Sequence, residues 1–227
     1  MTDSILYFGR KNCRYSDNLK KFLSKKAKKL YYIGSSKIYE KIPKTKITRS
    51  KYSYIICFRS FYILKRNLIN KATVAAINFH PGTPNYRGTG CVNYALFENA
   101  KYYGSTCHII NEKVDNGKII DVKKFRLRAN DTIETTLKKT YLIMLSQAKS
   151  VLNILFENED NMKLLIKKNK NIKWSNKIKK LNYLNKFYKI KLNCSKREIK
   201  NKIRATNTKF FKPYIVLHKK KFIYSDD

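Results

Sequence analysis

The chain has 227 residues, of which 43% are hydrophobic and 13% aromatic, so it can bury a core, and global disorder is excluded. Lysine and arginine outnumber aspartate and glutamate by 51 to 15, a formal net charge of +36. Because the lysines are spread over the whole length beside many Asn, Ile and Tyr residues, the charge indicates a coding bias and a solvated basic surface that favours anionic ligands, rather than a dedicated nucleic-acid groove.

Strands and helices alternate in the first half of the chain. Because of this alternation we expect a parallel sheet with right-handed crossovers, which binds ligands beyond the carboxyl ends of its strands. The expected strands cover residues 5–8, 31–33, 52–58 and 74–79, and the expected helices cover residues 16–28 and 66–70.

The second half is expected to add a helix at 92–99 and strands at 104–110 and 118–127. A turn at 115–117 joins these two strands. A long helix then starts at Asp131, a good N-cap residue with Glu134 three positions later, and buries an apolar stripe.

Residues 163–191 are rich in lysine but also carry apolar side chains, and we interpret them as a basic connection that packs partly on the main domain. A further helix is expected to begin at Ser195, with Glu198 completing a capping box, and a hairpin follows at 214–218 and 222–224. The expected division is a catalytic domain at 1–160, a basic connecting segment at 161–194, and a helix-hairpin extension at 195–227.

Cysteine spacing and hydropathy indicate the cell compartment that fits the sequence. The five cysteines are never spaced C-x-x-C, so the sequence predicts neither a disulfide framework nor a zinc site, and Cys57 and Cys107 are expected to be small buried hydrophobes. The first residues lack the features of a signal peptide, and no apolar run is long enough to span a bilayer. We expect a cytoplasmic protein that needs no metal.

One stretch between residues 77 and 120 concentrates chemically useful side chains. Asn78 and His80 are two positions apart at a strand end, so their side chains share one side, and Asp115 lies in the later turn. Acyl transfer to an amine needs a base near neutral pKa, such as His80, and a donor for the oxyanion, such as Asn78. Asp115 could orient the imidazole. Each residue alone is as well explained by a structural role, as a core histidine or a turn former.

The motif at residues 77–81 followed by Asp115-Asn116-Gly117 resembles the 10-formyltetrahydrofolate-dependent formyltransferases. That resemblance implies Asn78, His80 and Asp115 as the catalytic trio, on a Rossmann-like α/β fold. Residues 103–108 are similar to the family's Gly-x-Thr-x-His strand, which leaves His108 with a catalytic or a purely structural role. Residues 58–64 resemble the family's folate-binding strand end, so the resemblance implies a cofactor site near Phe61, Tyr62, Ile63 and Leu64.

Three branches of that family differ in sequence around this site. Residues 8–12 lack the glycine-rich phosphate loop of the purine enzymes, and residues 82–90 replace the Ser-Leu-Leu-Pro of those enzymes and of the methionyl-tRNA formyltransferases. The loop at 82–90 is similar to that of the sugar N-formyltransferases, as are residues 199–214. This branch implies an amino-sugar nucleotide as substrate, contacted by Tyr86, Arg87 and Gly88, and a homodimer.

The implied reaction moves a formyl group from 10-formyltetrahydrofolate to a nucleotide-linked 4-amino-4,6-dideoxy sugar for surface glycan synthesis. A methionyl-tRNA formyltransferase is the alternative, although residues after the long helix are few for a tRNA-binding domain. A non-enzymatic RNA-binding protein is the other alternative, because aromatic residues are interleaved with the lysines of 163–191.

Overall fold

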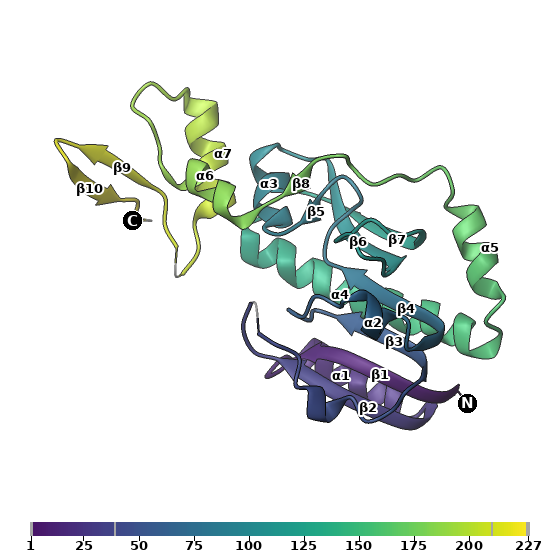
Figure 1. Cartoon of the computed structure of the whole chain (residues 1–227). Helices are drawn as coiled ribbons and strands as arrows, with labels where there is room; N and C mark the ends of the chain where they lie inside the picture. Colours follow the sequence, from purple (N-terminus) through teal and green to yellow (C-terminus); the bar gives the residue numbers. More distant parts are fainter. Residues whose placement is uncertain (1, 39, 210, 226–227) are drawn as a thin grey trace.

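The computed structural model describes residues 2–38, 40–209 and 211–225, and its centre is a six-stranded sheet in the order β2-β1-β3-β4-β6-β7 (Figure 1). The sheet strands are β1 (Thr2–Arg10), β2 (Ala27–Ser35), β3 (Tyr52–Phe58), β4 (Ala72–His80), β6 (Tyr102–Ile109) and β7 (Ile119–Arg126). The longer helices are α1 (Arg14–Ser24), α3 (Cys91–Phe97), α4 (Ile133–Glu157), α5 (Asn161–Lys168) and α7 (Lys196–Thr206). Shorter elements are α2 (Arg66–Ile69), α6 (Asn185–Tyr188), β5 (Arg87–Gly88), β8 (Ile178–Lys179), β9 (Tyr214–Leu217), β10 (Lys220–Ile223) and the 3-10 turns Lys44–Lys46 and Leu181–Leu184.

Strand direction confirms the predicted fold class. β1 pairs in parallel with β2 and β3, and β3 pairs in parallel with β4. β6 runs antiparallel to both β4 and β7. The sheet is therefore mostly parallel, and the carboxyl ends of β1 to β4 share one edge, where ligands of such sheets bind.

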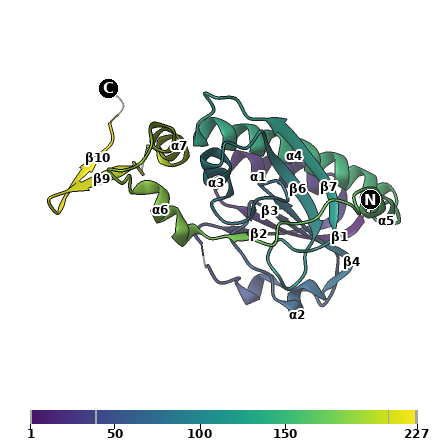
Figure 2. The same ribbon diagram turned by 90° about the horizontal axis from the view of Figure 1, so that it is seen from above.

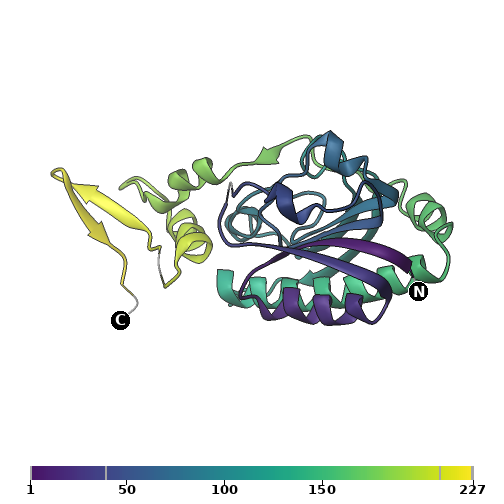
Figure 3. The same cartoon turned by 60° about the horizontal axis from the view of Figure 1, so that its bottom comes forward.

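Apolar side chains alternate along the strands and fill a core on each face of the sheet. The two long helices α1 and α4 lie side by side across one face (Figure 3). Phe79 points into this face, whereas Ala76 belongs to the core on the opposite face, under α2 and the loop after β3. Asn78 and His80 share the side of Ala76, so they lie on the face away from α1 and α4.

Among the predicted helix boundaries that were wrong, two have a clear physical reason. Helix α1 ends at Ser24 rather than at residue 28, because the chain must turn early for Ala27 of β2 to pair with Thr2 of β1. The N-cap of α4 is Thr132 rather than Asp131, and its capping box is closed by Thr135 instead of Glu134. Asp131 instead accepts a hydrogen bond from the backbone N–H of Arg128.

The C-terminal third contains more structure than the sequence predicts. Helix α5 was not expected, and β8 pairs in parallel with β5. Ser195 caps α7 as predicted, by accepting a hydrogen bond from the N–H of Glu198, but the Glu198 side chain pairs with Lys202 instead of completing the capping box. The β9–β10 hairpin is confirmed. The hairpin projects from the end of the molecule opposite α5 (Figure 2). The division at residues 160 and 194 stays a prediction.

Among the helices that the structure describes, none has the length and hydrophobicity needed to cross a membrane. All five cysteines are free thiols, and Cys57 and Cys107 are buried as expected.

Candidate functional site

The pairing register of strands β4 and β6 sets the positions of the first two side chains of the site. Asn78 of β4 pairs directly with His108 of the antiparallel strand β6. The Asn78 Nδ2 atom lies 3.1 Å from His108 Nε2, and His108 Nδ1 donates to the carbonyl oxygen of Ile109 at 2.8 Å. Because Nδ1 carries the hydrogen, Nε2 of a neutral His108 is the acceptor for the Asn78 amide. His108 therefore belongs to the predicted cluster.

Asp115 connects the three side chains. Its Oδ2 atom lies 3.2 Å from His80 Nδ1 and accepts a hydrogen bond of 2.9 Å from the backbone N–H of Gly88. Its Oδ1 atom lies 3.5 Å from both Asn78 Nδ2 and His108 Nε2. The structure thus brings the predicted trio together at the carboxyl end of β4.

The Asp115 carboxylate is strongly favoured in its charged form. Burial alone would raise the pKa of Asp115, since its exposed fraction is 7%. The positive charge of His80, the His108 contact and the Gly88 N–H outweigh burial and hold the pKa of Asp115 well below its usual range. Asp115 is therefore a fixed negative charge beside two imidazole rings.

Both ring nitrogens of His80 face oxygen atoms. Nδ1 faces Asp115, and Nε2 donates a 2.7 Å hydrogen bond to the carbonyl oxygen of Tyr86. A carbonyl oxygen only accepts hydrogen bonds, so this arrangement uses both N–H groups of a protonated ring.

Gly82 permits this close approach. A Cβ atom at residue 82 would lie 2.6 Å from His80 Nε2 and 2.8 Å from the Tyr86 carbonyl oxygen. Thr106 Oγ1 donates to the Gly82 carbonyl and Tyr103 Oη donates to the Pro81 carbonyl, each at 2.7 Å. Strand β6 therefore holds the loop after His80 in place.

The three residues predicted to bind substrate have other contacts in this structure. The Tyr86 ring is buried in the core around α3, and Gly88 binds Asp115 through its N–H. Arg87 is only 6% exposed and donates to the carbonyl oxygens of Val114 and Ser175 at 2.6 and 3.4 Å. Its Nε atom is buried without a hydrogen-bond partner in the described part of the chain. Contact of these residues with a sugar or phosphate stays a prediction.

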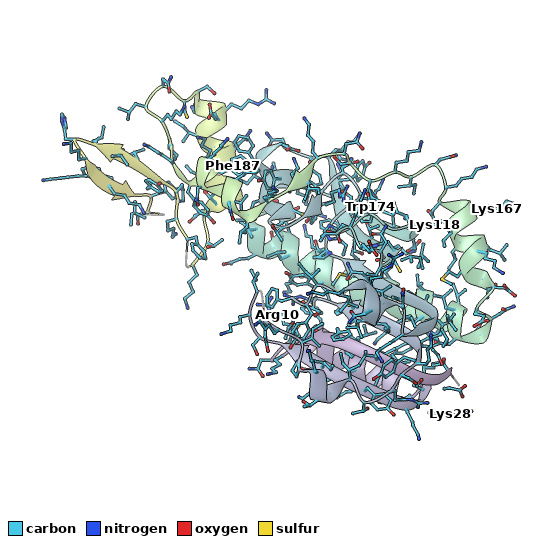
Figure 4. All side chains as sticks on the ribbon, viewed as in Figure 1. Arg10, Lys28, Lys118, Lys167, Trp174 and Phe187 are labelled. Atoms are coloured by element: carbon cyan, nitrogen blue, oxygen red, sulfur yellow. The ribbon has the colours of Figure 1, made fainter. Side chains whose placement is uncertain are left out.

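A segment distant in sequence covers the site. Residues 169–180, here called the strap, run from α5 across the ends of β6 and β7 to β8 (Figure 1). Trp174 of the strap stands edge-on to His108 and His80, with ring centroids 5.0 and 5.8 Å apart, and Figure 4 shows its position. Trp174 Nε1 donates to the Gly117 carbonyl at 2.8 Å. His80 is only 4% exposed beneath these contacts.

Two backbone hydrogen bonds join the strap to the chain that follows β4. The Ser175 N–H donates to the Pro84 carbonyl, and the Thr89 N–H donates to the Lys179 carbonyl, each at 2.9 Å. Gly88 has φ of +101° and a Cβ there would lie 2.2 Å from the Lys179 carbonyl oxygen, so only glycine allows β5 and β8 to pair this closely.

The loop predicted to hold the folate follows β3, next to β4 in the sheet. Tyr62 and Leu64 are buried in the core, Phe61 is half-buried, and Ile63 is 65% exposed. Within the described residues, the backbone groups of Ile63 and Leu64 form no hydrogen bond. This free backbone edge fits a flat heterocycle that is recognised through main-chain donors and acceptors. Its use by a pterin stays a prediction.

Sequence reasoning missed the strap. Its only signal is the single tryptophan of the chain, placed within a lysine-rich stretch. Within the described residues, no cluster of three or more His, Cys, Asp or Glu side chains is arranged to hold a metal ion.

The formyl transferase family matches residues 7–143, and the chain belongs to this family. A curated relative is the bifunctional polymyxin resistance protein ArnA of Wigglesworthia glossinidia brevipalpis, 26% identical over 115 residues. That match covers 49% of this chain and 18% of the relative, so the chain corresponds to a small part of that protein.

Solved structures of sugar N-formyltransferases share the fold along nearly the whole chain. A 4-N formyltransferase from Francisella tularensis has a TM-score of 0.76 at 17% identity, covering 98% of this chain and 97% of that one. An N-formyltransferase from Helicobacter canadensis, in complex with folinic acid and dTDP-3-aminofucose, has a TM-score of 0.66 at 20% identity, covering 96% and 85%. The similarity includes the strap and the C-terminal elements of this chain.

Proposed function

We propose that this protein transfers the formyl group of 10-formyltetrahydrofolate to the amino group of a nucleotide-linked amino-dideoxy sugar. The observation that carries the proposal is the convergence of Asn78 and His80 on the buried carboxylate of Asp115. Family membership and the fold shared with sugar N-formyltransferases support it. The first candidate acceptor is dTDP-4-amino-4,6-dideoxyglucose, a precursor for surface glycans, and the expected site of action is the cytoplasm.

His80 carries the proton transfer in this proposal. Asp115 holds Nδ1–H of the ring, which leaves Nε2 to accept a proton from the attacking amine. In this proposal the amine takes the position that the Tyr86 carbonyl now holds against Nε2.

Asn78 stabilises charge on the formyl oxygen. One of its amide hydrogens is directed to His108 Nε2 at 3.1 Å, whereas its contact with Asp115 is long, at 3.5 Å. The second hydrogen is therefore the one available to an oxygen that gains negative charge during transfer. His108 then acts as a positioning residue for this amide.

The co-substrate supplies the formyl carbon, and its ring is expected to lie on the backbone edge at 61–64. Ile63 is exposed and Phe61 is half-buried there, whereas Tyr62 and Leu64 anchor the loop in the core. Tyr86, Arg87 and Gly88 are proposed to contact the acceptor once the strap has moved. A homodimer is expected for a protein of this branch.

The test incubates the protein with 10-formyltetrahydrofolate and a panel of acceptors, comprising several amino-sugar nucleotides and methionyl-tRNA. Mass spectrometry follows formylation of each acceptor. The proposal predicts a formamido product from at least one amino-sugar nucleotide and none from the tRNA. Formylation of the tRNA alone would assign the protein to the alternative branch, and salt-sensitive RNA binding without turnover would favour a binding protein.

A further inference from the structure

Arg87 is a buried cation without an anionic partner. Its side chain is 6% exposed, and among the ion pairs of the described residues none includes it. Because a buried charge is costly unless hydrogen bonds compensate it, the hydrogen bonds of Arg87 indicate its role. Nη2 donates to the Val114 carbonyl at 2.6 Å, whereas the contact of Nη1 with the Ser175 carbonyl is long, at 3.4 Å. The Val114 carbonyl is therefore the main partner of Arg87.

That carbonyl belongs to the peptide group that joins Val114 to Asp115. The orientation of this peptide group sets the φ angle of Asp115, which is +45°, in the left-handed region. Residues with a side chain adopt this region at a cost, although aspartate tolerates it better than most. The hydrogen bond from Arg87 holds the peptide group in the orientation that this φ angle requires. Arg87 therefore stabilises the backbone conformation from which the Asp115 carboxylate reaches His80.

The side chains that precede Asp115 do little to hold this turn. Residues 111–114 are all exposed, and Val114 is 45% exposed. Glu112 pairs with Arg66 at 2.9 Å, but both side chains are more than half exposed, and a surface pair of this kind contributes little. Arg87, in contrast, contacts the same stretch from a buried position. The exposed segment therefore depends on its backbone contact with Arg87.

The residue after Arg87 holds the side chain of Asp115. The Gly88 N–H donates to Asp115 Oδ2 at 2.9 Å, and the same oxygen lies 3.2 Å from His80 Nδ1. Arg87 and Gly88 form β5, which pairs with β8 beside it (Figure 1). Two consecutive residues of a paired strand thus hold the backbone and the carboxylate of Asp115. The distance from that carboxylate to His80 depends on both contacts.

We propose that Arg87 is a positioning residue for Asp115 and acts through the peptide group of Val114, an inference that rests on the proposed function. Nη2 makes this contact. Nη1, with its long contact to Ser175, and Nε, which has no partner among the described residues, remain for the acceptor contact proposed above. Lysine cannot replace this arginine, because a single ammonium group lacks the planar fork of donors. Without the contact, the peptide group before Asp115 rotates and the carboxylate moves away from His80.

The first test needs no substrate. Proton NMR at low temperature detects the hydrogen that His80 Nδ1 donates to the Asp115 carboxylate, and loss of the signal in His80→Ala assigns it. The signal should shift or disappear in Arg87→Lys. It should persist in the matched control Arg126→Lys, which makes the same substitution at an exposed arginine of β7. Arg87→Met, which also removes the buried charge, is the second variant and should behave as Arg87→Lys does.

The second test combines Arg87→Lys with Asp115→Asn and measures kcat at a temperature where circular dichroism shows every variant folded. Arg87→Lys alone should lower kcat about 10- to 100-fold, because a displaced carboxylate misaligns the His80 ring. In the Asp115→Asn background the same substitution should lower kcat less than about 2-fold, since the carboxylate through which Arg87 acts is already absent. A purely structural role would give the same loss in both backgrounds.

Two results would overturn this role of Arg87. One is an unchanged His80 signal in Arg87→Lys, and the other is an equal loss of kcat in the two backgrounds. Failure of the proposed function is distinguishable from both. A His80 signal that depends on Arg87, in a protein that formylates no amino sugar, would refute formyl transfer and leave the positioning of Asp115 in place.

Discussion

Replacing Asp115 by Asn removes the one negative charge of the site while keeping the side-chain size. The new amide presents N–H groups to some of the donors whose hydrogen bonds the carboxylate now accepts, on His80, Asn78 and the backbone of Gly88. Breaking a buried charge interaction of this kind costs about 3–5 kcal/mol. Because His80 loses the group that fixes its tautomer, kcat should fall about 10²- to 10⁴-fold.

The assay measures the rate of tetrahydrofolate release at saturating substrate concentrations, at a temperature where circular dichroism shows that the variant is folded. Urea unfolding measures the free energy of unfolding of the variant. Asp121→Asn on β7 is the matched control, since Asp121 accepts a hydrogen bond from Gln147 Nε2 outside the site. The control should keep a kcat near that of the unmodified protein. A kcat of that size in Asp115→Asn itself would refute the assigned role of the carboxylate.

Three further predictions concern the loop, pH and the strap. Gly82→Ala should fold, but its kcat should fall at least about 10-fold because the new methyl group displaces the His80 ring. Steady-state kinetics measures this loss, and an unchanged kcat would contradict the assigned position of His80. Because folding depresses the pKa of Asp115, the stability from its charge is present above its unfolded pKa of about 3.9 and is lost as pH falls below it. The difference in unfolding free energy between the unmodified protein and Asp115→Asn should therefore shrink below about pH 4, and a constant difference would contradict this linkage. Trp174, the single tryptophan, should become more accessible to acrylamide quenching when folate and acceptor bind; unaltered quenching with normal turnover would show that the strap stays closed.

The sequence predicts the sheet and the trio because both depend on local patterns. Alternating apolar residues define β3 and β4, and residues two apart on a strand share a side, so Asn78 and His80 had to be neighbours. Asp115 lies in the turn that joins β6 to β7, and β6 is the strand that pairs with β4.

Features that depend on distant contacts could not be predicted in this way. The strap reaches the site only because β8 pairs with β5, about ninety positions earlier in the chain, and two-residue strands leave no periodic pattern. The partners of Arg87, the carbonyls of Val114 and Ser175, are likewise set by tertiary packing. The end of α1 was misplaced because helical propensity continues past Ser24, whereas pairing of β2 with β1 requires extended backbone at Ala27.

Formyl transfer by the His80 cluster is tested most directly by an isotope experiment. The protein is given 10-formyltetrahydrofolate labelled with ¹³C in the formyl group, together with dTDP-4-amino-4,6-dideoxyglucose, and NMR follows the label. If His80 carries the proton transfer, a ¹³C formamide signal should appear on the sugar nucleotide with the unmodified protein, and almost none with His80→Ala. Equal label transfer by the two proteins would contradict it.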